Sequence, residues 1–440
     1  MAVWKRLASQ SAILFAARLC GAGLTFVAQA AIARAFGSAV LGNYLLVMAT
    51  VNLIAVVMPL GFETTGTYFA AEYRARGEGR LLFGFLRRAY GHVAVTTLLL
   101  LCFGAPVAGL FGVPGRVFAA HWLPACLLAF STALIFVSGA VLIGLKRPYA
   151  GLLADTIFRP MMVFAGFLIG LVAGADKHFD YLVWGVATGI TLVALVQLGF
   201  LVQALKSVPA TMPPRPDEWR RWWRFAAPWV AITLATEFFF DLDLLVLSNM
   251  LSREELAIFG VCTRFFSLVA FGVGVVYSVT MPDMFESEAK ADRIGFLRKI
   301  GEANFVASGL SVLLFFVVAL GAPIALLLFG KSFQAGAAPL AVLCLALVMR
   351  SIFGPTSIVL SVHDRPYATL PAIGLGIVVL VGGNLLLVPA MGLMGAAVAA
   401  LASITLWSAA QWYTVLRIAG VDVSIRARLV RTAAAATLAE

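Results

Sequence analysis

The chain alternates long apolar stretches with short polar ones, and this pattern predicts helices that cross a membrane. A spanning helix needs about 20 mostly apolar residues, and twelve such stretches occur, each bounded by charged residues, Pro or Gly. They cover 11–36, 38–62, 88–111, 118–145, 149–174, 180–205, 225–250, 254–282, 301–329, 335–362, 366–389 and 391–418. The first is too long for a signal-peptide core and lacks an obvious cleavage site, so we expect a retained helix. The longest polar segments, 63–87, 206–224 and 283–300, are predicted to be loops.

The composition agrees with a membrane protein. Of the 440 residues, 62% are apolar and only 12% are charged, whereas about a quarter of the residues of a soluble globular domain are charged. The twelve stretches and their connections account for the whole chain. We therefore expect no separate soluble domain.

Basic residues are distributed unevenly between alternate connections. If the N-terminus is cytoplasmic, 23 of the 28 Lys and Arg residues at the ends of the stretches or between them lie on the cytoplasmic side. The other five are Arg34, Arg116, Lys177, Arg253 and Lys331. This asymmetry follows the positive-inside rule, so both termini are predicted to be cytoplasmic. The net charge of +11 is thereby explained by topology, and we expect no nucleic-acid partner.

One stretch of the chain recurs 218 residues later. Residues 110–152 align with 328–370 without a gap, and 14 of the 43 aligned positions are identical. Leu-Phe-Gly occurs at 110–112 and 328–330, and Arg-Pro-Tyr-Ala occurs at 147–150 and 365–368. We expect the second motif to be architectural, at the turn between the fourth and fifth helices of each half, because Pro suits a first helical turn and Tyr suits the membrane interface.

The repeat predicts two halves of six helices each. An even number of spans gives both halves the same orientation, as in transporters built from parallel repeats, whose substrate site lies between the lobes. The predicted fold class is an all-α polytopic membrane protein with about 12 transmembrane helices in two parallel six-helix repeats around a central cavity. We expect an N-terminal lobe at 1–205, a cytoplasmic linker at 206–224, a C-terminal lobe at 225–418 and a cytoplasmic tail at 419–440.

The linker has two parts. Its Pro-rich part should be stiff and extended, and the sequence DEWRRWWR at 217–224 predicts a short interfacial helix on the anionic inner leaflet. The linker then serves either as a hinge between the lobes or as a simple juxtamembrane anchor.

Four arginines lie inside apolar stretches: Arg18, Arg159, Arg264 and Arg350. At 1.5 Å per residue they lie roughly 10–25 Å from the start of their spans. An arginine that faces lipid at such a depth costs at least about 2.5–3.5 kcal/mol. Each should therefore face a partner or a water-filled cavity.

The four arginines differ in their local alternatives. Arg159 follows Asp155 by four residues, so it either pairs on one helix face or faces the cavity. Arg350 either caps carbonyls near Gly354–Pro355 or lines the cavity. Arg18 and Arg264 have no acidic residue within one turn, and we expect both in the cavity.

Acidic residues concentrate in the seventh stretch. Glu237 and Asp241 are four residues apart and are expected to share a helix face, whereas Asp243 points elsewhere. Two carboxylates on one buried face repel each other, so the pair needs a proton or a cation, or else it forms salt bridges with the intramembrane arginines.

Other residue types give no sign of catalytic chemistry. All five cysteines fall within apolar stretches without paired spacing, so we expect buried thiols and neither a disulfide nor a metal site. The four histidines are scattered along the chain. We predict that the protein is not an enzyme and has no cofactor.

Several motifs resemble the polysaccharide exporters, or Wzx-like flippases, of the multidrug/oligosaccharidyl-lipid/polysaccharide (MOP) superfamily. In the first half these are ARAFGSAVLGNYLL at 33–46 and LGFETTGTYFAAEYRARGE at 60–78. In the second half they are DLLVLSNMLSREELAIFGVCTRF at 243–265, LFGKSFQAGAAPLAVL at 328–343 and NLLLVPAMGLMGAAVAALAS at 384–403. Together with the repeat they cover most of the chain.

The resemblance implies twelve to fourteen helices in two lobes around a central cavity with alternating access. It implies export of an undecaprenyl-diphosphate-linked oligosaccharide to the outer leaflet for O-antigen, lipopolysaccharide or exopolysaccharide synthesis, alongside membrane lipids, a polysaccharide polymerase and assembly proteins as partners. Because the sequence ends at Glu440 after a basic tail, we expect a fourteen-helix version to be either absent or truncated. The resemblance also implies a bacterial inner membrane.

The resemblance also implies roles for particular residues. Relatives place cavity arginines on the first and eighth helices, which Arg18 and Arg264 match. Some bind a coupling ion, H⁺ or Na⁺, between the seventh, eleventh and twelfth helices. Glu237 or Asp241 with Asn384 and Thr405 corresponds to that site, although Val388, one turn after Asn384, supplies no carboxylate.

A lipid-linked diphosphate also fits the residues, because the planar guanidinium of arginine binds phosphate oxygens well. A membrane glycosyltransferase or polymerase is the first rival, but it would be expected to carry acidic residues in a large external loop. The nearer rival is a multidrug exporter of the same superfamily, for which we expect fewer cavity arginines and more aromatic or acidic lining for cationic drugs.

Overall fold

The computed structural model describes residues 2–172, 178–209, 218–289, 293–362 and 365–426. Every regular element in these ranges is a helix. The chain divides into two compact units, Met1–Asn249 and Met250–Glu440, here named unit 1 and unit 2. Residues 210–217 of the expected linker and 427–440 of the expected tail lie outside the described residues.

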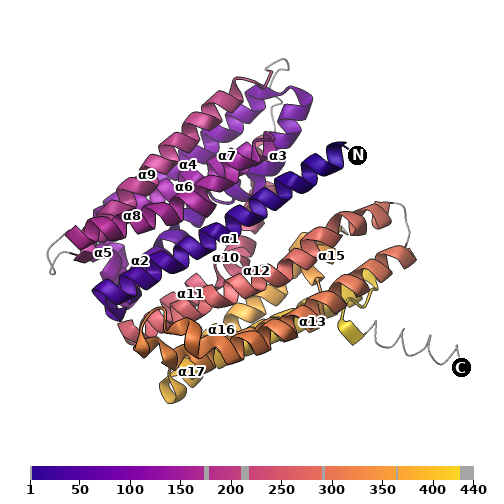
Figure 1. Cartoon of the computed structure of the whole chain (residues 1–440). Coiled ribbons are helices and arrows are strands. Elements are labelled where there is room, and N and C mark those ends of the chain that lie inside the picture. The colour runs from indigo at the N-terminus through magenta and orange to yellow at the C-terminus, as the bar shows by residue number, and fades with distance from the viewer. Residues whose placement is uncertain (1, 173–177, 210–217, 290–292, 363–364, 427–440) are drawn as a thin grey trace, which may run out of the picture. The chain divides into compact units, whose positions relative to one another are not determined.

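The helices follow one another as Figure 1 labels them. Unit 1 contains α1 (Ala2–Phe36), α2 (Ser38–Val57), α3 (Phe62–Arg76), α4 (Gly79–Ala108), η1 (Gly109–Phe111), α5 (Gly112–Ala120), α6 (Trp122–Gly144), α7 (Pro148–Leu153), η2 (Ala154–Phe158), α8 (Arg159–Val172), α9 (His178–Leu205), α10 (Glu218–Thr236) and α11 (Phe239–Leu247). Unit 2 contains α12 (Arg253–Ala289), α13 (Arg293–Leu326), η3 (Lys331–Gly336), α14 (Ala337–Phe353), α15 (Thr356–Val362), η4 (Pro366–Thr369), α16 (Leu370–Met391) and α17 (Leu393–Ala419).

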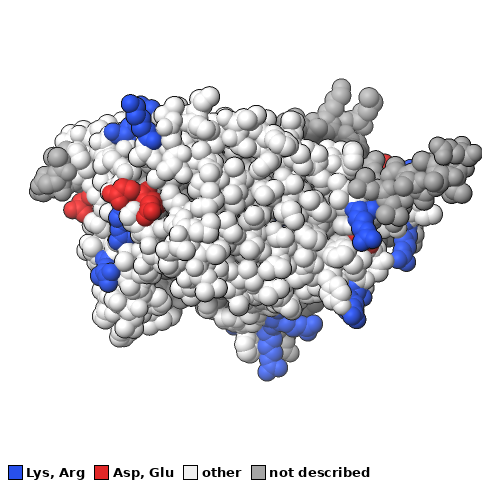
Figure 2. Space-filling view, turned by 90° about the horizontal axis from the view of Figure 1, so that it is seen from below, with Lys and Arg blue, Asp and Glu red and all other residues white. Residues whose placement is uncertain are grey.

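Eleven helical segments of the described chain are long and apolar enough to cross a membrane. They coincide with eleven of the twelve predicted stretches and confirm an all-α, multi-pass membrane protein. The visible face in Figure 2 is largely uncharged, with acidic and basic side chains in a few separate groups. The remaining predicted stretch, the seventh, at 225–250, is not a continuous helix, because α10 ends at Thr236 and α11 begins at Phe239.

The prediction of loops is wrong in part for two segments. Most of 63–87 is helical, as α3 and the start of α4, and α12 and α13 together extend over much of 283–300. Gly61 and Gly77 bound α3 with φ angles of 85° and 68°, which glycine adopts without strain. Polarity marks where a helix leaves the apolar layer, whereas the backbone hydrogen bonds of a helix continue into water.

The internal repeat is confirmed by the backbone. Arg147 and Arg365 precede the first turns of α7 and η4 with similar angles, φ −117° and ψ 60° against φ −126° and ψ 50°. The amide of Arg147 donates to Leu142 O and that of Arg365 to Leu360 O, both at 2.9 Å. Gly112 and Gly330, which end the two Leu-Phe-Gly motifs, both have positive φ. The two Arg-Pro-Tyr-Ala motifs thus build the same turn, and both Leu-Phe-Gly motifs end at a glycine with positive φ.

The packing within each unit also repeats. In unit 1, α9 packs against α6 and α8, and in unit 2, α17 packs against α14 and α16 (Figure 1). The last two helices before Asn249 do not follow this repeated packing. Of these two, α10 packs on α3 and α11 packs on α2. The boundary between the two units follows Asn249, so α10 and α11 belong to unit 1.

The Trp-rich start of α10 is packed against α3. Trp222 is buried, and its indole N–H donates to the Tyr73 hydroxyl at 2.6 Å. That hydroxyl donates to Glu218 Oε2 at 3.1 Å, and Arg221 forms an ion pair with Glu72 at 2.7 Å. These contacts hold the start of α10 to α3. They lie outside the candidate spans.

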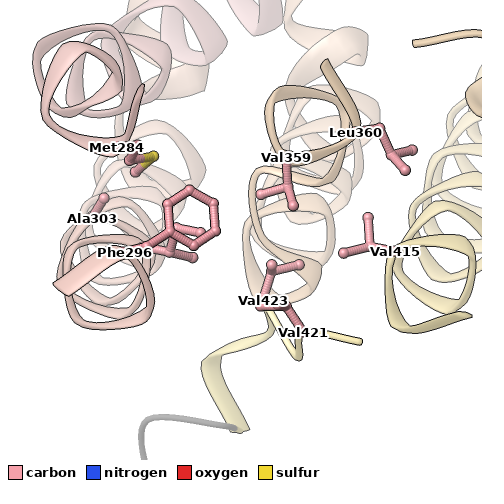
Figure 3. Close-up of a cluster of buried hydrophobic side chains, with 9 residues drawn as sticks. Met284, Phe296, Ala303, Val359, Leu360, Val415, Val421 and Val423 are labelled. Atoms are coloured by element: carbon pink, nitrogen blue, oxygen red, sulfur yellow. The ribbon is translucent and has the colours of Figure 1, made fainter. Parts of the chain in front are cut away.

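A buried apolar cluster closes one end of unit 2. It joins side chains of α12, α13, α15, α17 and the segment after α17: Met284, Phe296, Ile300, Ala303, Val359, Leu360, Val415, Val421 and Val423 (Figure 3). The Asn304 amide donates to Val423 O at 3.0 Å. The first residues of the expected tail are therefore part of the core of unit 2.

Candidate functional site

A chain of polar contacts crosses unit 1 at the level of the predicted spans. Arg159 Nη1 contacts Asp155 Oδ1 at 3.1 Å, and Arg159 Nη2 donates to the side-chain oxygen of Asn52. The Asn52 amide donates to Asp241 Oδ2 at 3.2 Å. The Arg159 side chain is 13% exposed and Asp241 is 5% exposed. The pairing of Arg159 with Asp155 is one of the two alternatives that the sequence left open, and only the fold connects it to Asp241.

The backbone before Arg159 departs from the α-helix. Residues Ala154–Phe158 form the π-helical turn η2, and the Arg159 amide donates to Ala154 O. Pro160 has no amide hydrogen to give to the carbonyl of Thr156. That carbonyl lies against α1, where a Cβ added to Gly21 would stand 1.6 Å from Thr156 O. Short π-helical turns occur frequently at functional sites.

The interruption between α10 and α11 lies beside this network. Phe238, in the interruption, packs against Phe136 of α6 with ring centroids 6.1 Å apart. The Arg159 guanidinium lies 5.9 Å from the same Phe136 ring. Glu237 is exposed, whereas Asp241 is buried. Because the helix is interrupted after Thr236, the expectation that both carboxylates share one continuous helix face is wrong.

Glu63, at the start of α3, is a candidate that the sequence reading missed. It is 6% exposed, accepts a hydrogen bond from Thr64 Oγ1 at 3.1 Å, and its Oε2 has no hydrogen-bond partner in the described part of the chain. Thr64 also contacts Thr233 of α10 at 3.2 Å. Burial raises the pKa of the Glu63 carboxyl to about 7, partly offset by hydrogen bonds from Thr64 and nearby backbone amides. The only sequence signal is an acidic residue at the end of an apolar stretch.

Arg350 lines a cavity of about 140 Å³ within unit 2. Its guanidinium lies 6.0 Å from the centre of the Trp407 ring on α17. Gly354 and Pro355, which separate α14 from α15, line the same cavity. Arg350 thus lies near a helix break and beside a cavity within unit 2.

The remaining predicted residues lie in both units. In unit 1, Arg18 is exposed on α1. In unit 2, Arg264 on α12 and Thr405 on α17 are half-buried, and Asn384 on α16 is buried. All four arginines lie inside candidate membrane spans.

All five cysteines are free. Cys126, Cys262 and Cys344 are buried as expected, whereas Cys20 and Cys102 are exposed, so the expectation of burial is wrong for these two. An apolar stretch predicts membrane depth but does not predict which face of a helix meets lipid.

The whole fold is similar to solved transporter structures. An inward-facing multidrug resistance MATE family transporter of the MOP superfamily superposes with a TM-score of 0.75 at 14% identity, over 91% of this chain and 95% of that one. Lipid II flippase MurJ in an inward closed conformation gives 0.74 at 13% identity, over 92% and 87%. The Vibrio cholerae MATE transporter VcmN in its bent form gives 0.62 at 15% identity, over 95% and 98%.

At these identities the comparisons establish the fold, which is that of MOP superfamily transporters. No protein-family model and no curated protein sequence matches the chain. The likeness therefore bears on the fold alone.

Proposed function

We propose that the protein is an alternating-access flippase that moves an undecaprenyl-diphosphate-linked oligosaccharide from the cytoplasmic to the outer leaflet of the bacterial inner membrane, with both termini cytoplasmic. It acts without covalent chemistry, so it is not an enzyme and uses no cofactor. The lipid-linked oligosaccharide is its substrate, and membrane lipids, a polysaccharide polymerase and assembly proteins are its partners in surface polysaccharide synthesis.

The observation that carries this proposal is the presence of four arginines inside candidate membrane spans of a transporter fold shared with a lipid II flippase. Each arginine facing lipid costs at least about 2.5–3.5 kcal/mol, so a membrane protein retains them where they bind an anion or a fixed partner. Arginine binds phosphate oxygens through two parallel hydrogen bonds, which suits a diphosphate head group.

The four arginines are assigned different tasks. Arg18 and Arg264 bind the diphosphate, and Arg350 binds a more distal part of the substrate. Arg159 contacts Asp155 and Asn52, so it reaches substrate only by exchanging these partners, and it also positions α11 through Asn52 and Asp241.

The membrane potential favours this direction of transport. A diphosphate carries about two negative charges, and outward movement down an inside-negative potential is favourable by about 2.3 kcal/mol per charge per 100 mV. The emptied carrier returns with its positive arginines, which the same potential draws inward. A coupling ion, H⁺ or Na⁺, bound at Glu237 or Asp241 with Asn384 and Thr405, adds a second driving force.

Reconstitution into liposomes tests the function. Vesicles that contain the purified protein and a fluorescent polyprenyl-diphosphate oligosaccharide should expose the sugar on the opposite leaflet under an imposed potential, as measured by a membrane-impermeant quencher. Arg18→Ala and Arg264→Ala should each reduce the rate by about tenfold or more, the loss of one charged hydrogen-bonded contact. Arg80→Ala, which removes an exposed arginine at the start of α4, is the matched control.

Multidrug export is the second candidate, because two of the similar folds above belong to MATE transporters. The same vesicles loaded with a cationic dye separate the two functions. Dye export without movement of the lipid-linked sugar would replace the flippase proposal, and normal sugar movement by both alanine variants would contradict the role of the arginines.

A further inference from the structure

The cavity in unit 2 is enclosed by four helices of that unit. Its walls come from α12, α14, α15 and α17, and its polar side chains include Tyr277, Arg350, Thr356, Trp407, Ser408 and Gln411. Trp407, Gln411 and Thr356 are 9%, 5% and 5% exposed, whereas Arg350 is exposed at the rim. The cavity is thus lined by buried aromatic, amide and hydroxyl side chains together with one exposed positive charge.

The inner polar groups have fixed orientations. Thr356 Oγ1 donates to Gln411 Oε1 at 2.8 Å, so the Gln411 amide directs its N–H₂ donors elsewhere. The Tyr277 hydroxyl donates to Asn304 Oδ1 at 2.8 Å, which leaves its oxygen as an acceptor. The other polar groups of the lining are one guanidinium, an indole N–H and several hydroxyls. No acidic side chain occurs among the described residues of the lining.

The helix break that shapes the cavity belongs to the second half alone. In the ungapped repeat, Arg350 aligns with Thr132, and Gly354–Pro355 aligns with Phe136–Val137. In the first half, α6 is continuous through these positions. In the second half, Gly354 has a φ of 86°, and a Cβ added there would stand 2.2 Å from Val423 O. The packed segment after α17 therefore requires glycine at the break.

The apolar cluster of Figure 3 supports the cavity from one side. Val359 of α15 and Val415 of α17 belong to that cluster, each about one helical turn beyond Thr356 and Gln411. The two helices that carry the inner polar groups are thereby held in place, so the cavity is preorganised for binding.

We propose that this cavity binds one acidic sugar residue, a pyranose that carries a carboxylate, of the oligosaccharide that the protein transports. This inference rests on the proposed flippase function and names the substrate chemistry at Arg350. The carboxylate pairs with Arg350, the ring packs against the indole of Trp407, and the sugar hydroxyls exchange hydrogen bonds with Gln411, Ser408 and Tyr277.

Size and charge favour this ligand over the other candidates. A lone phosphate is smaller than the 140 Å³ cavity and makes no use of its aromatic and aliphatic walls. A cationic drug meets Arg350 and no acidic partner in the lining, and like charges repel. A sugar acid has one negative charge for one guanidinium, a face of C–H groups for the indole, and hydroxyls for the amide.

The experiment compares two lipid-linked disaccharides that differ only in the terminal residue, glucuronate in one and glucose in the other. The full-length protein in liposomes should move the glucuronate substrate faster by about fivefold, the effect of one partly exposed ion pair. Arg350→Gln should abolish this preference. Arg417→Gln, which removes an exposed arginine at the end of α17, is the matched control and should retain it.

A binding measurement guards against a variant that fails to fold. Free glucuronate should raise the melting temperature of the unmutated protein and of Arg417→Gln, and glucose and inorganic phosphate should have a smaller effect. Loss of that shift in an Arg350→Gln protein of normal abundance supports the site.

The outcomes separate this inference from the proposed function. Equal transport of the two substrates by the unmutated protein, a preference that survives Arg350→Gln, or equal stabilisation by phosphate would overturn the sugar site while leaving flippase function intact. Transport of neither substrate would overturn both.

Discussion

The buried carboxyl of Glu63 should make stability depend on pH. Its pKa is raised from 4.5 to about 7 by burial. At pH values below about 4.5 the carboxyl is protonated in the folded and unfolded states alike. As the pH rises from there through 7, the unfolded state ionises first, so the free energy of unfolding falls by about 3 kcal/mol in total.

Glu63→Gln removes this titration. The variant should be more stable than the unmutated protein at pH 8 and similar to it at pH 5, as measured by thermal unfolding in detergent. Glu254→Gln, at an exposed position at the start of α12, is the matched control for the loss of one carboxylate. A pH dependence that persists in Glu63→Gln would show that another group causes it.

Gly21 permits the closest approach between α1 and the π-helical turn η2. A Cβ at this position would stand 1.6 Å from Thr156 O, whereas a Cβ at Gly23 meets nothing within 4 Å. Gly21→Ala should therefore push α1 away and lower the free energy of unfolding by about 1–3 kcal/mol.

Gly23→Ala lies two residues further along the same helix and is the matched control. It should be neutral or slightly stabilising, because alanine favours a helix interior over glycine. Thermal unfolding of the two variants in one detergent compares them directly. Equal stability would contradict the contact between α1 and η2.

At the scale of whole helices, the two halves of the repeat differ in where their helices are interrupted. The counterpart of α6 is divided at Gly354–Pro355 into α14 and α15, and the stretch that opens the second half is divided into α10 and α11. Each interruption lies beside polar side chains, Arg350 in unit 2 and Asp241 in unit 1. Broken helices are common where membrane transporters bind substrates or ions.

The whole molecule should have both termini in the cytoplasm, as the distribution of Lys and Arg indicates. Lys331 and Arg80 are exposed and lie on opposite sides of the membrane in this topology. In a chain whose exposed Cys20 and Cys102 are replaced by Ala, Lys331→Cys should react with an impermeant maleimide in intact cells. Arg80→Cys should react only after the cells are opened. The reverse pattern would invert the topology.

The sequence alone determined the membrane-spanning character and the internal repeat. A run of about 20 apolar residues is a local property, so eleven of the spans could be placed without knowledge of their neighbours. The Arg-Pro-Tyr-Ala turns were predictable for the same reason, because a proline restricts its own backbone wherever the chain takes it. The four-residue spacing of a helix offered the pairing of Arg159 with Asp155 as one of two alternatives.

Only the tertiary structure decided which polar groups meet. Asn52 and Asp241 are 189 residues apart, and no periodicity relates them. The interruption after Thr236 separated the two carboxylates that an unbroken helix would have aligned, and the packing of α3 buried Glu63. The cavity at Arg350 needed side chains from four helices. The hydrophobic pattern of the chain determines how deep a residue lies in the membrane. Helix packing determines which other side chains a polar or charged residue contacts, and so what it can do.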